Sequence, residues 1–123
     1  MIGMISKSFT FEAAHKLPNT KNNENNNIHG HSFSVEVFIA DINNNIKLNG
    51  IILDFSIFKN KIDKVKNILD HSFLNDIKGL EYPTLENIGY WIFNMLEKDN
   101  LTIYKVIVQR KSCGESFTLS KKL

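Results

Sequence analysis

Three of the four histidines are spaced so that their side chains can converge on one cation. His29 and His31 flank Gly30 at the start of an alternating run, and His15 closes an earlier alternating run. In an extended chain the side chains at positions i and i+2 leave the same face, about 6.6 Å apart along the strand. Gly30 has no Cβ atom, so ligands can approach the chain closely there. If the two strands pair, the three imidazoles meet.

Three protein ligands with a fourth position left open form the arrangement that holds a catalytic zinc ion. A His-x-His pattern alone is weak evidence, because ordinary polar or core histidines also produce it. The third histidine, His15, favours a metal site. Zinc is the ion that we expect among those that bind imidazole.

The fourth histidine, His71, directly follows Asp70 at the predicted end of a helix. Two interpretations of this pair stay open. Asp70 is a capping residue and His71 a surface cation near a helix C-terminus, or the pair is a general acid and base, because an unperturbed imidazole titrates near pH ~6.5. Glu24 has the same ambiguity: it is either a solvated charge in an asparagine-rich loop or, being close to His29, a base at the metal.

The composition is that of a globular domain rather than of a disordered or membrane-spanning chain. The 123 residues fit one domain, 1–123, and 42% of them are apolar while 23% are charged. A net charge of +2 is too small to indicate nucleic acid or an anionic membrane as the main partner, and neither is expected. The single cysteine, Cys113, cannot form an internal disulfide, and neither a signal peptide nor a membrane span is evident. We therefore expect a cytoplasmic protein.

The hydrophobic pattern predicts strands where apolar residues alternate and helices where they recur every three or four positions. Strands are expected at residues 5–15, 31–41, 102–110 and from 117 onward, with helices at 55–69 and from Thr84 to about 98. Residues 46–54 are expected to return as a strand that forms a hairpin with 31–41, its turn at the asparagines 43–45. Asp54 or Ser56 is expected to cap the first helix and Thr84 the second.

Strands that flank a pair of helices indicate an α+β fold, here a four-stranded antiparallel sheet with two helices on one face in the order ββααββ. The other face of such a sheet still needs cover. In a chain this short, that cover is expected from another subunit, so the sequence predicts an oligomer.

The chain resembles the 6-pyruvoyl-tetrahydropterin synthase family, which includes the 6-carboxytetrahydropterin synthases of the queuosine pathway. The resemblance covers nearly the whole length, and it is carried by the motifs Phe11-Glu12-Ala13-Ala14-His15-Lys16-Leu17-Pro18, His29-Gly30-His31-Ser32-Phe33, Leu53-Asp54-Phe55, Leu69-Asp70-His71-Ser72-Phe73-Leu74-Asn75 and Pro83-Thr84-Leu85-Glu86-Asn87-Ile88. It implies the tunnelling fold, in which subunits pair their sheets into trimeric barrels and two trimers stack into a homo-hexamer.

The resemblance also implies a lyase with zinc on His15, His29 and His31, acting on 7,8-dihydroneopterin triphosphate. The product is 6-carboxytetrahydropterin in one branch of the family and 6-pyruvoyltetrahydropterin in another. His71 with Asp70 matches the family's catalytic relay pair.

The sequence departs from the family pattern at two positions. Asn25 stands where the family usually has the cysteine that abstracts a proton, and Glu24 is adjacent. Some relatives use a nearby glutamate instead and cleave dihydroneopterin substrates toward folate precursors. Arg110 stands where the family has the glutamate that binds the pterin's amino and ring NH groups, and an arginine only donates hydrogen bonds. Glu115 is the candidate to substitute for it if the turn is shifted.

The sequence is therefore compatible with three functions. The first is the zinc-dependent pterin lyase, with Arg110 and Glu115 as substrate-binding residues. The second is the glutamate-based relative with a different pterin product. The third is a zinc- and ligand-binding homologue whose catalysis is altered.

Overall fold

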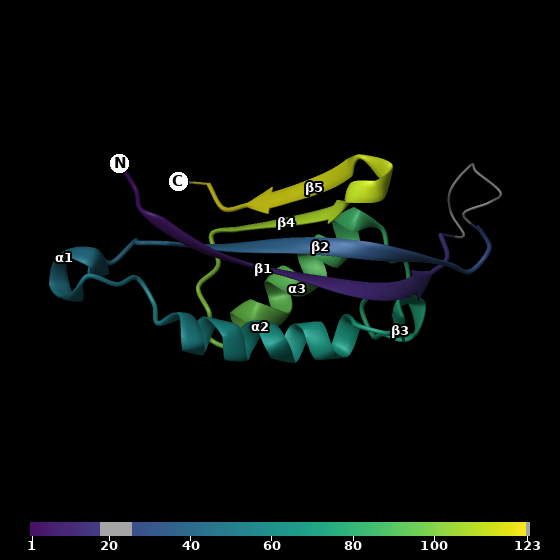
Figure 1. The fold of residues 1–123 in the computed structure, drawn as a ribbon, viewed down its shortest axis with the longest axis horizontal. Helices are drawn as coiled ribbons and strands as arrows, with labels where there is room; N and C mark the ends of the chain where they lie inside the picture. Colours follow the sequence, from purple (N-terminus) through teal and green to yellow (C-terminus); the bar gives the residue numbers. More distant parts are fainter. Residues whose placement is uncertain (18–25, 123) are drawn as a thin grey trace.

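The computed structural model describes residues 1–17 and 26–122. Its strands are β1 (Met4–His15), β2 (His29–Ala40), β3 (Ser72–Phe73), β4 (Lys105–Arg110) and β5 (Glu115–Ser120). Its helices are α1 (Asn45–Asn49), α2 (Phe55–Leu69) and α3 (Leu85–Lys98), with short 3-10 turns at η2 (Leu74–Asp76) and η3 (Lys111–Cys113). The five strands form one sheet in the order β3-β1-β2-β4-β5 (Figure 1).

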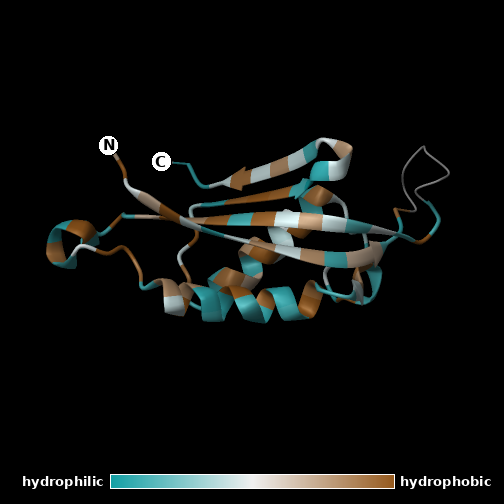
Figure 2. Ribbon diagram, viewed as in Figure 1, coloured by the Kyte–Doolittle hydropathy of each residue, from teal (hydrophilic) through white to brown (hydrophobic). Residues whose placement is uncertain are grey.

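The helices α2 and α3 lie on one face of this sheet, and the core fills the space between (Figures 1 and 2). Apolar residues that alternate along the strands are almost fully buried there, among them Phe11, Phe33, Val35, Val37 and Val108. The helices contribute the buried residues Phe58, Ile62, Leu69, Ile88 and Ile92. The predicted α+β class and the two helices on one face are confirmed.

The sheet has one strand more than the expected four. The additional strand, β3, has two residues and runs parallel to the end of β1, while the other neighbours are antiparallel. It exists because the chain that leaves α2 returns directly beside Ala13 and Ala14. This return places Asp70 and His71 beside Glu12, near the end of β1.

Both predicted helix starts are confirmed. The side chain of Asp54 accepts a hydrogen bond from the backbone N–H of Ser56 at 2.7 Å. The hydroxyl oxygen of Thr84 accepts one from the backbone N–H of Asn87 at 3.2 Å. These side chains satisfy N–H groups that have no partner inside the first helical turn.

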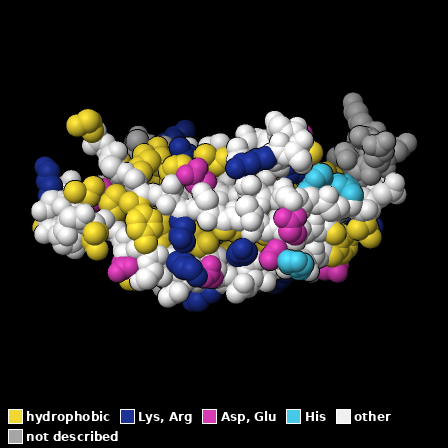
Figure 3. All heavy atoms as spheres, viewed as in Figure 1, with side chains coloured by type: hydrophobic (Ala, Val, Ile, Leu, Met, Phe, Trp, Pro, Cys, Tyr) yellow, Lys and Arg dark blue, Asp and Glu magenta, His cyan; other side chains and the backbone are white. Residues whose placement is uncertain are grey.

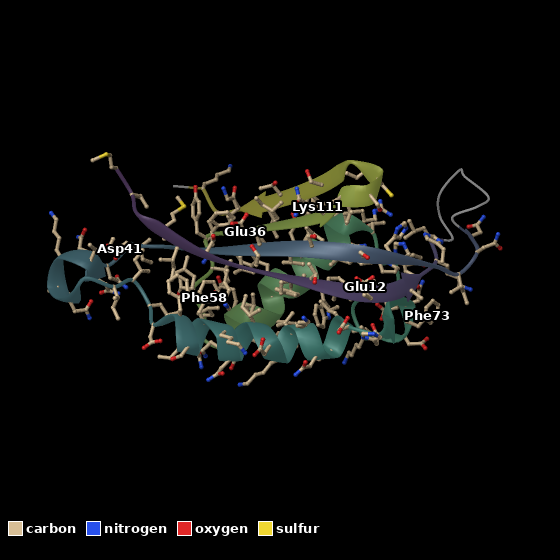
Figure 4. The ribbon with its side chains drawn as sticks, in the orientation of Figure 1. Glu12, Glu36, Asp41, Phe58, Phe73 and Lys111 are labelled. Carbon is tan, nitrogen blue, oxygen red and sulfur yellow. The ribbon has the colours of Figure 1, made fainter. Side chains whose placement is uncertain are left out.

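The strand expected at 46–54 is wrong, and so is its hairpin with β2. Residues Asn45–Asn49 form the short helix α1, and Asp41 lies close to this helix (Figure 4). The carboxylate of Asp41 accepts from the backbone N–H of Asn45 at 2.7 Å and of Ile46 at 3.2 Å, which fixes a helical turn in place of a strand. Gly50 then ends the helix at φ 85°, in the left-handed region that glycine adopts readily.

The face of the sheet away from the helices carries mainly polar side chains. Ser8, Thr10, Glu12 and Ser32 are exposed there, and Glu36 is half-buried. Among the described residues no helix has the length and apolar character needed to cross a membrane.

Candidate metal centre and active site

The three histidines singled out by their spacing lie together where β1 ends and β2 begins. The antiparallel register places His15 opposite His29 and Ala13 opposite His31. One nitrogen from each ring can be chosen so that all three lie within 4.8 Å of one another. The ring centroids are 4.6 to 5.2 Å apart. The predicted convergence of three imidazoles is therefore present, and this group is called the histidine trio below.

Backbone carbonyl groups set the orientation of two rings of the trio. Nδ1–H of His15 donates to the carbonyl oxygen of Pro83 at 2.9 Å, and Nδ1–H of His29 donates to that of Asn27 at 2.8 Å. A carbonyl can only accept, so the proton of each neutral ring is on Nδ1 and the lone pair on Nε2. Metal-binding histidines are commonly oriented in this way.

The buried nitrogen of His15 supports a metal site in particular. His15 is 1% exposed, and its Nε2 atom has no hydrogen-bond partner among the residues that the structure describes. Leaving a buried polar atom unpaired costs about 1–3 kcal/mol. A cation on Nε2 would remove that cost, so the donor set fits a metal ion.

The surroundings of His15 and His31 favour the uncharged form that a metal requires. Burial lowers the pKa of His15 to about 4, with smaller contributions from the neighbouring His29, His31 and Arg110. The pKa of His31 is also lowered, first by burial and then by Arg110. Neutral imidazoles present lone pairs, whereas protonated ones repel a cation.

We expect the metal-free protein to lose stability as the pH falls from about 6.5 to about 4. In that range His15 is protonated in the unfolded chain but not in the folded chain. The unfolded state therefore binds more protons as the pH falls, and the free energy of unfolding decreases. The folded pKa of about 4 corresponds to a loss of about 3 kcal/mol across that range. Urea unfolding of chelator-treated protein at several pH values measures it.

The variant H15Q is the control for this titration. Its free energy of unfolding is expected to vary less between pH 6.5 and 4, because the glutamine does not titrate. A wild-type unfolding free energy that is the same at pH 7 and pH 5 would contradict the assignment.

Asp70 and His71 are held at the same end of the sheet by the backbone of Glu12. The Oδ1 atom of Asp70 accepts the N–H of Glu12 at 2.8 Å, a bond that lowers the pKa of the Asp70 carboxyl group. The N–H of His71 donates to the carbonyl oxygen of Glu12 at 2.6 Å. The Nδ1 atom of His71 lies 3.1 Å from Oδ2 of Asp70, while the imidazole is 80% exposed. Asp70 therefore orients His71 in addition to ending α2.

His71 and His31 line one open cavity of about 480 Å³. Glu12 and Ser32 line it as well, and the hydroxyl of Ser32 donates to Oε2 of Glu12 at 2.6 Å. Figure 3 shows the histidine side chains in two places at this end of the molecule, with acidic side chains between them. Of the trio only His31 lines this cavity, and of the Asp70–His71 pair only His71 lines it.

Arg110 and Glu115 lie beside the trio on neighbouring strands. They face each other at the turn between β4 and β5, where Nη2 of Arg110 is 3.2 Å from Oε1 of Glu115. The guanidinium of Arg110 lowers the pKa of His31 and the carboxylate of Glu115 raises it, both less strongly than burial lowers it. The arginine side chain is 14% exposed and the glutamate side chain 53%.

The sequence did not predict the residues whose backbone groups position the side chains of the site. The carbonyl groups of Pro83 and Asn27 and the peptide groups of Glu12 give no signal in a side-chain pattern. Asn75 is a further case: its side chain bonds the backbone N–H and carbonyl of Lys16 at 3.0 and 2.9 Å and so fixes the chain next to His15.

Two residues of the sequence-based site, Glu24 and Asn25, lie outside the described residues. Their roles stay predictions from the sequence. Cys113 is an exposed free cysteine in η3.

The family model for 6-pyruvoyl tetrahydropterin synthase matches residues 4–121, which is nearly the whole chain. The chain belongs to this family. The match includes the histidine trio, the Asp70–His71 pair and the Arg110–Glu115 pair.

Curated members of the family share substantial identity with the chain. A 6-carboxy-5,6,7,8-tetrahydropterin synthase of Synechocystis is 45% identical over 98 residues, covering 77% of this chain and 75% of that protein. A dihydroneopterin monophosphate aldolase of Pyrococcus furiosus is 39% identical over 90 residues, covering 73% and 71%. The relatives of this chain therefore include proteins that are named for different reactions.

A solved structure supports the fold independently. The 6-pyruvoyl tetrahydropterin synthase of Caenorhabditis elegans superposes with a TM-score of 0.80 at 23% identity, covering 99% of this chain and 97% of that one. The predicted tunnelling fold of this family is therefore confirmed.

Proposed function

We propose that the chain is a zinc-dependent lyase that acts on 7,8-dihydroneopterin triphosphate and forms 6-carboxytetrahydropterin or 6-pyruvoyltetrahydropterin. The observation that supports this most is the group of three imidazoles at the end of β1 and the start of β2, with a carboxylate-held histidine on the chain that pairs with the end of β1. The name of the Synechocystis relative, a 6-carboxy-5,6,7,8-tetrahydropterin synthase, favours the first product.

The Asp70–His71 pair is suited to move protons. Because Asp70 accepts the Nδ1–H of His71, the Nε2 atom of the ring is left to take or give a proton at the substrate. A zinc ion on His15, His29 and His31 would supply Lewis acidity toward the oxygens of the substrate side chain.

A second candidate is the glutamate-based reaction that cleaves dihydroneopterin substrates toward folate precursors. Two observations favour it: Asn25 replaces the usual cysteine next to Glu24, and a relative at 39% identity is named an aldolase. The third candidate, a zinc- and ligand-binding homologue with altered catalysis, follows if neither reaction occurs.

Incubation of the zinc-loaded protein with dihydroneopterin triphosphate is expected to separate the three functions. Release of acetaldehyde supports the carboxy-forming lyase, and a hydroxymethylpterin product supports the glutamate-based reaction. No turnover with the metal intact leaves the third candidate. If Glu24 is the base, E24Q is expected to lose about 100-fold or more in turnover, since a general base contributes 10²–10⁴-fold. Unchanged turnover in E24Q would remove Glu24 from this role.

We further propose a homo-hexamer built from two trimers, located in the cytoplasm. Within the described residues, the outer edge of β1 from Met4 to Phe11 and the outer edge of β5 have no strand partner. Open edges invite pairing between copies, and contacts of one kind that close on themselves produce rings. Sedimentation of the purified protein at the mass of one 14.2 kDa chain would contradict this assembly.

A further inference from the structure

We propose that Asn75, in η2, is a positioning residue for the metal ligand His15 and thereby sets how tightly the histidine trio holds an ion. The inference rests on the metal centre of the proposed function. Asn75 acts through two backbone segments: one follows His15 in the chain, and the other orients its ring.

The pairing of β1 with its neighbours ends at the metal ligand. The last register pair with β2 is His15 opposite His29, and the last pair with β3 is Ala14 beside Phe73. Lys16, the next residue, has no partner in either ladder among the described strands. Chain ends without such partners open easily. Opening here would reach a residue whose imidazole must keep a fixed position.

The side chain of Asn75 supplies the partner that the ladder lacks. After Phe73 the backbone leaves the sheet and forms η2. The amide of Asn75 takes its place: Oδ1 accepts the N–H of Lys16 at 3.0 Å, and Nδ2 donates to the carbonyl oxygen of Lys16 at 2.9 Å. An asparagine amide has an acceptor and donors, as a peptide group has. One side chain thus binds both backbone groups of the residue next to His15.

The same amide also contacts the segment that orients the His15 ring. Its Nδ2 atom donates to the carbonyl oxygen of Glu81 at 3.3 Å. Two residues later, the carbonyl oxygen of Pro83 accepts from Nδ1 of His15 at 2.9 Å. Asn75 therefore joins the backbone after His15 to the backbone that holds its ring. A shift of either segment would move Nε2 of His15 relative to the other two nitrogens of the trio.

The first measurement is the zinc affinity of N75D. Aspartate has the shape of asparagine and keeps an acceptor for the N–H of Lys16, but its carboxylate has no donor for the two carbonyl oxygens. N75D is expected to bind zinc at least about tenfold more weakly than wild type, because changes in the groups that orient metal ligands cost about 10–100-fold in affinity. The added negative charge attracts a cation, so it cannot itself cause this loss.

The matched control is N45A. Nδ2 of Asn45 also donates to a backbone carbonyl oxygen, that of Ile52 at 3.4 Å. Asn45 begins α1, which lies at the end of the molecule away from β3 (Figure 1). N45A is expected to bind zinc as wild type does. Urea unfolding of the metal-free variants measures how much stability each substitution removes.

The second measurement needs no metal and reports the position of the ring itself. His15 is 1% exposed, and its Nδ1–H group is bonded to Pro83. In metal-free wild type this proton is therefore expected to exchange slowly with solvent and to give its own imidazole N–H resonance in NMR spectra. N75D is expected to shift or lose this resonance, and N45A to keep it. A lower stability alone does not move a resonance of the folded form.

The inference is overturned if folded N75D keeps either the zinc affinity or the His15 resonance of wild type. It is also overturned if N45A loses as much zinc affinity as N75D, since the effect would then not depend on the place of the asparagine. If N75D does not fold, N75A, which removes all three bonds without adding charge, decides by the same two measurements. Wild type that holds no zinc contradicts the metal centre of the proposed function, and the His15 resonance then decides alone whether Asn75 positions the ring.

Discussion

Replacing His31 by glutamine is expected to remove zinc binding, whereas the same substitution at His71 leaves zinc binding intact. His31 supplies one of the three nitrogens that lie within 4.8 Å of one another. Outer-shell changes already cost 10–100-fold in metal affinity, so loss of a ligand is expected to cost at least about 100-fold. Because the chain has only four histidines, His71 is a matched control within the same protein. Metal analysis of untagged protein measures the bound zinc per chain.

Thermal unfolding gives a second measure of the same change. A ligand that binds only the folded state at 100 times its Kd stabilises it by about 2.7 kcal/mol. Added zinc is therefore expected to raise the Tm of wild type and of H71Q, but not that of H31Q. The metal assignment is wrong if H31Q retains a full equivalent of zinc. It is also wrong if wild type holds less than about a third of an equivalent after zinc is added.

The sequence was sufficient to predict the trio because strand periodicity is a local property with a simple rule. His15 has the parity of Phe11, and His31 has that of Phe33, so pairing of the two strands puts the rings on the same face. Their order in the register, with His15 opposite His29, then follows from the positions at which the two strands meet.

The rest of the site depends on contacts between segments far apart in the chain. The carbonyl of Pro83 orients His15 from 68 residues away. The peptide groups of Glu12 hold Asp70 and His71 in a similar way. No pattern of side-chain types reports where a backbone group will lie, so these partners could not be predicted. The same limit explains the wrong prediction at 46–54, where the first residues are helical and the carboxylate of Asp41 binds the N–H groups of Asn45 and Ile46.

Substitution of His71 is expected to reduce turnover, and the stability of the variant is expected to depend on whether the new residue tolerates a left-handed backbone. The structure gives this residue φ 58°, in the left-handed region, and the other described non-glycine residues with positive φ, Asn44 and Asn100, are both asparagines. For a residue with a Cβ atom this conformation costs about 1–2 kcal/mol. Strain of this kind is found at functional sites, where the surrounding structure holds a side chain in place. Here His71 donates from its ring to the carboxylate of Asp70 and from its backbone N–H to the carbonyl oxygen of Glu12, and these contacts hold the imidazole at the cavity.

Comparing H71G with H71A separates the imidazole from the backbone strain. Both variants lose the proton-transferring group and are expected to lose at least about 100-fold in turnover. The glycine variant relieves the strain, so it is expected to be about 0.5–1 kcal/mol more stable than the alanine variant, after allowance for the greater freedom of glycine in the unfolded chain. Urea unfolding and the product assay measure the two properties.

Asn100 supplies the matched control for His71, because it has φ 62° at the end of α3 and lies outside the proposed site. N100G and N100A are expected to differ in stability in the same direction and to keep full turnover, since neither removes a group that contacts the substrate. If H71G keeps wild-type turnover, His71 is not the proton-transferring residue. If H71G is less stable than H71A, the left-handed backbone at this position is not a source of strain. A loss of turnover in both His71 variants together with greater stability in H71G would mean that the chain sustains a strained backbone at His71 for the sake of catalysis.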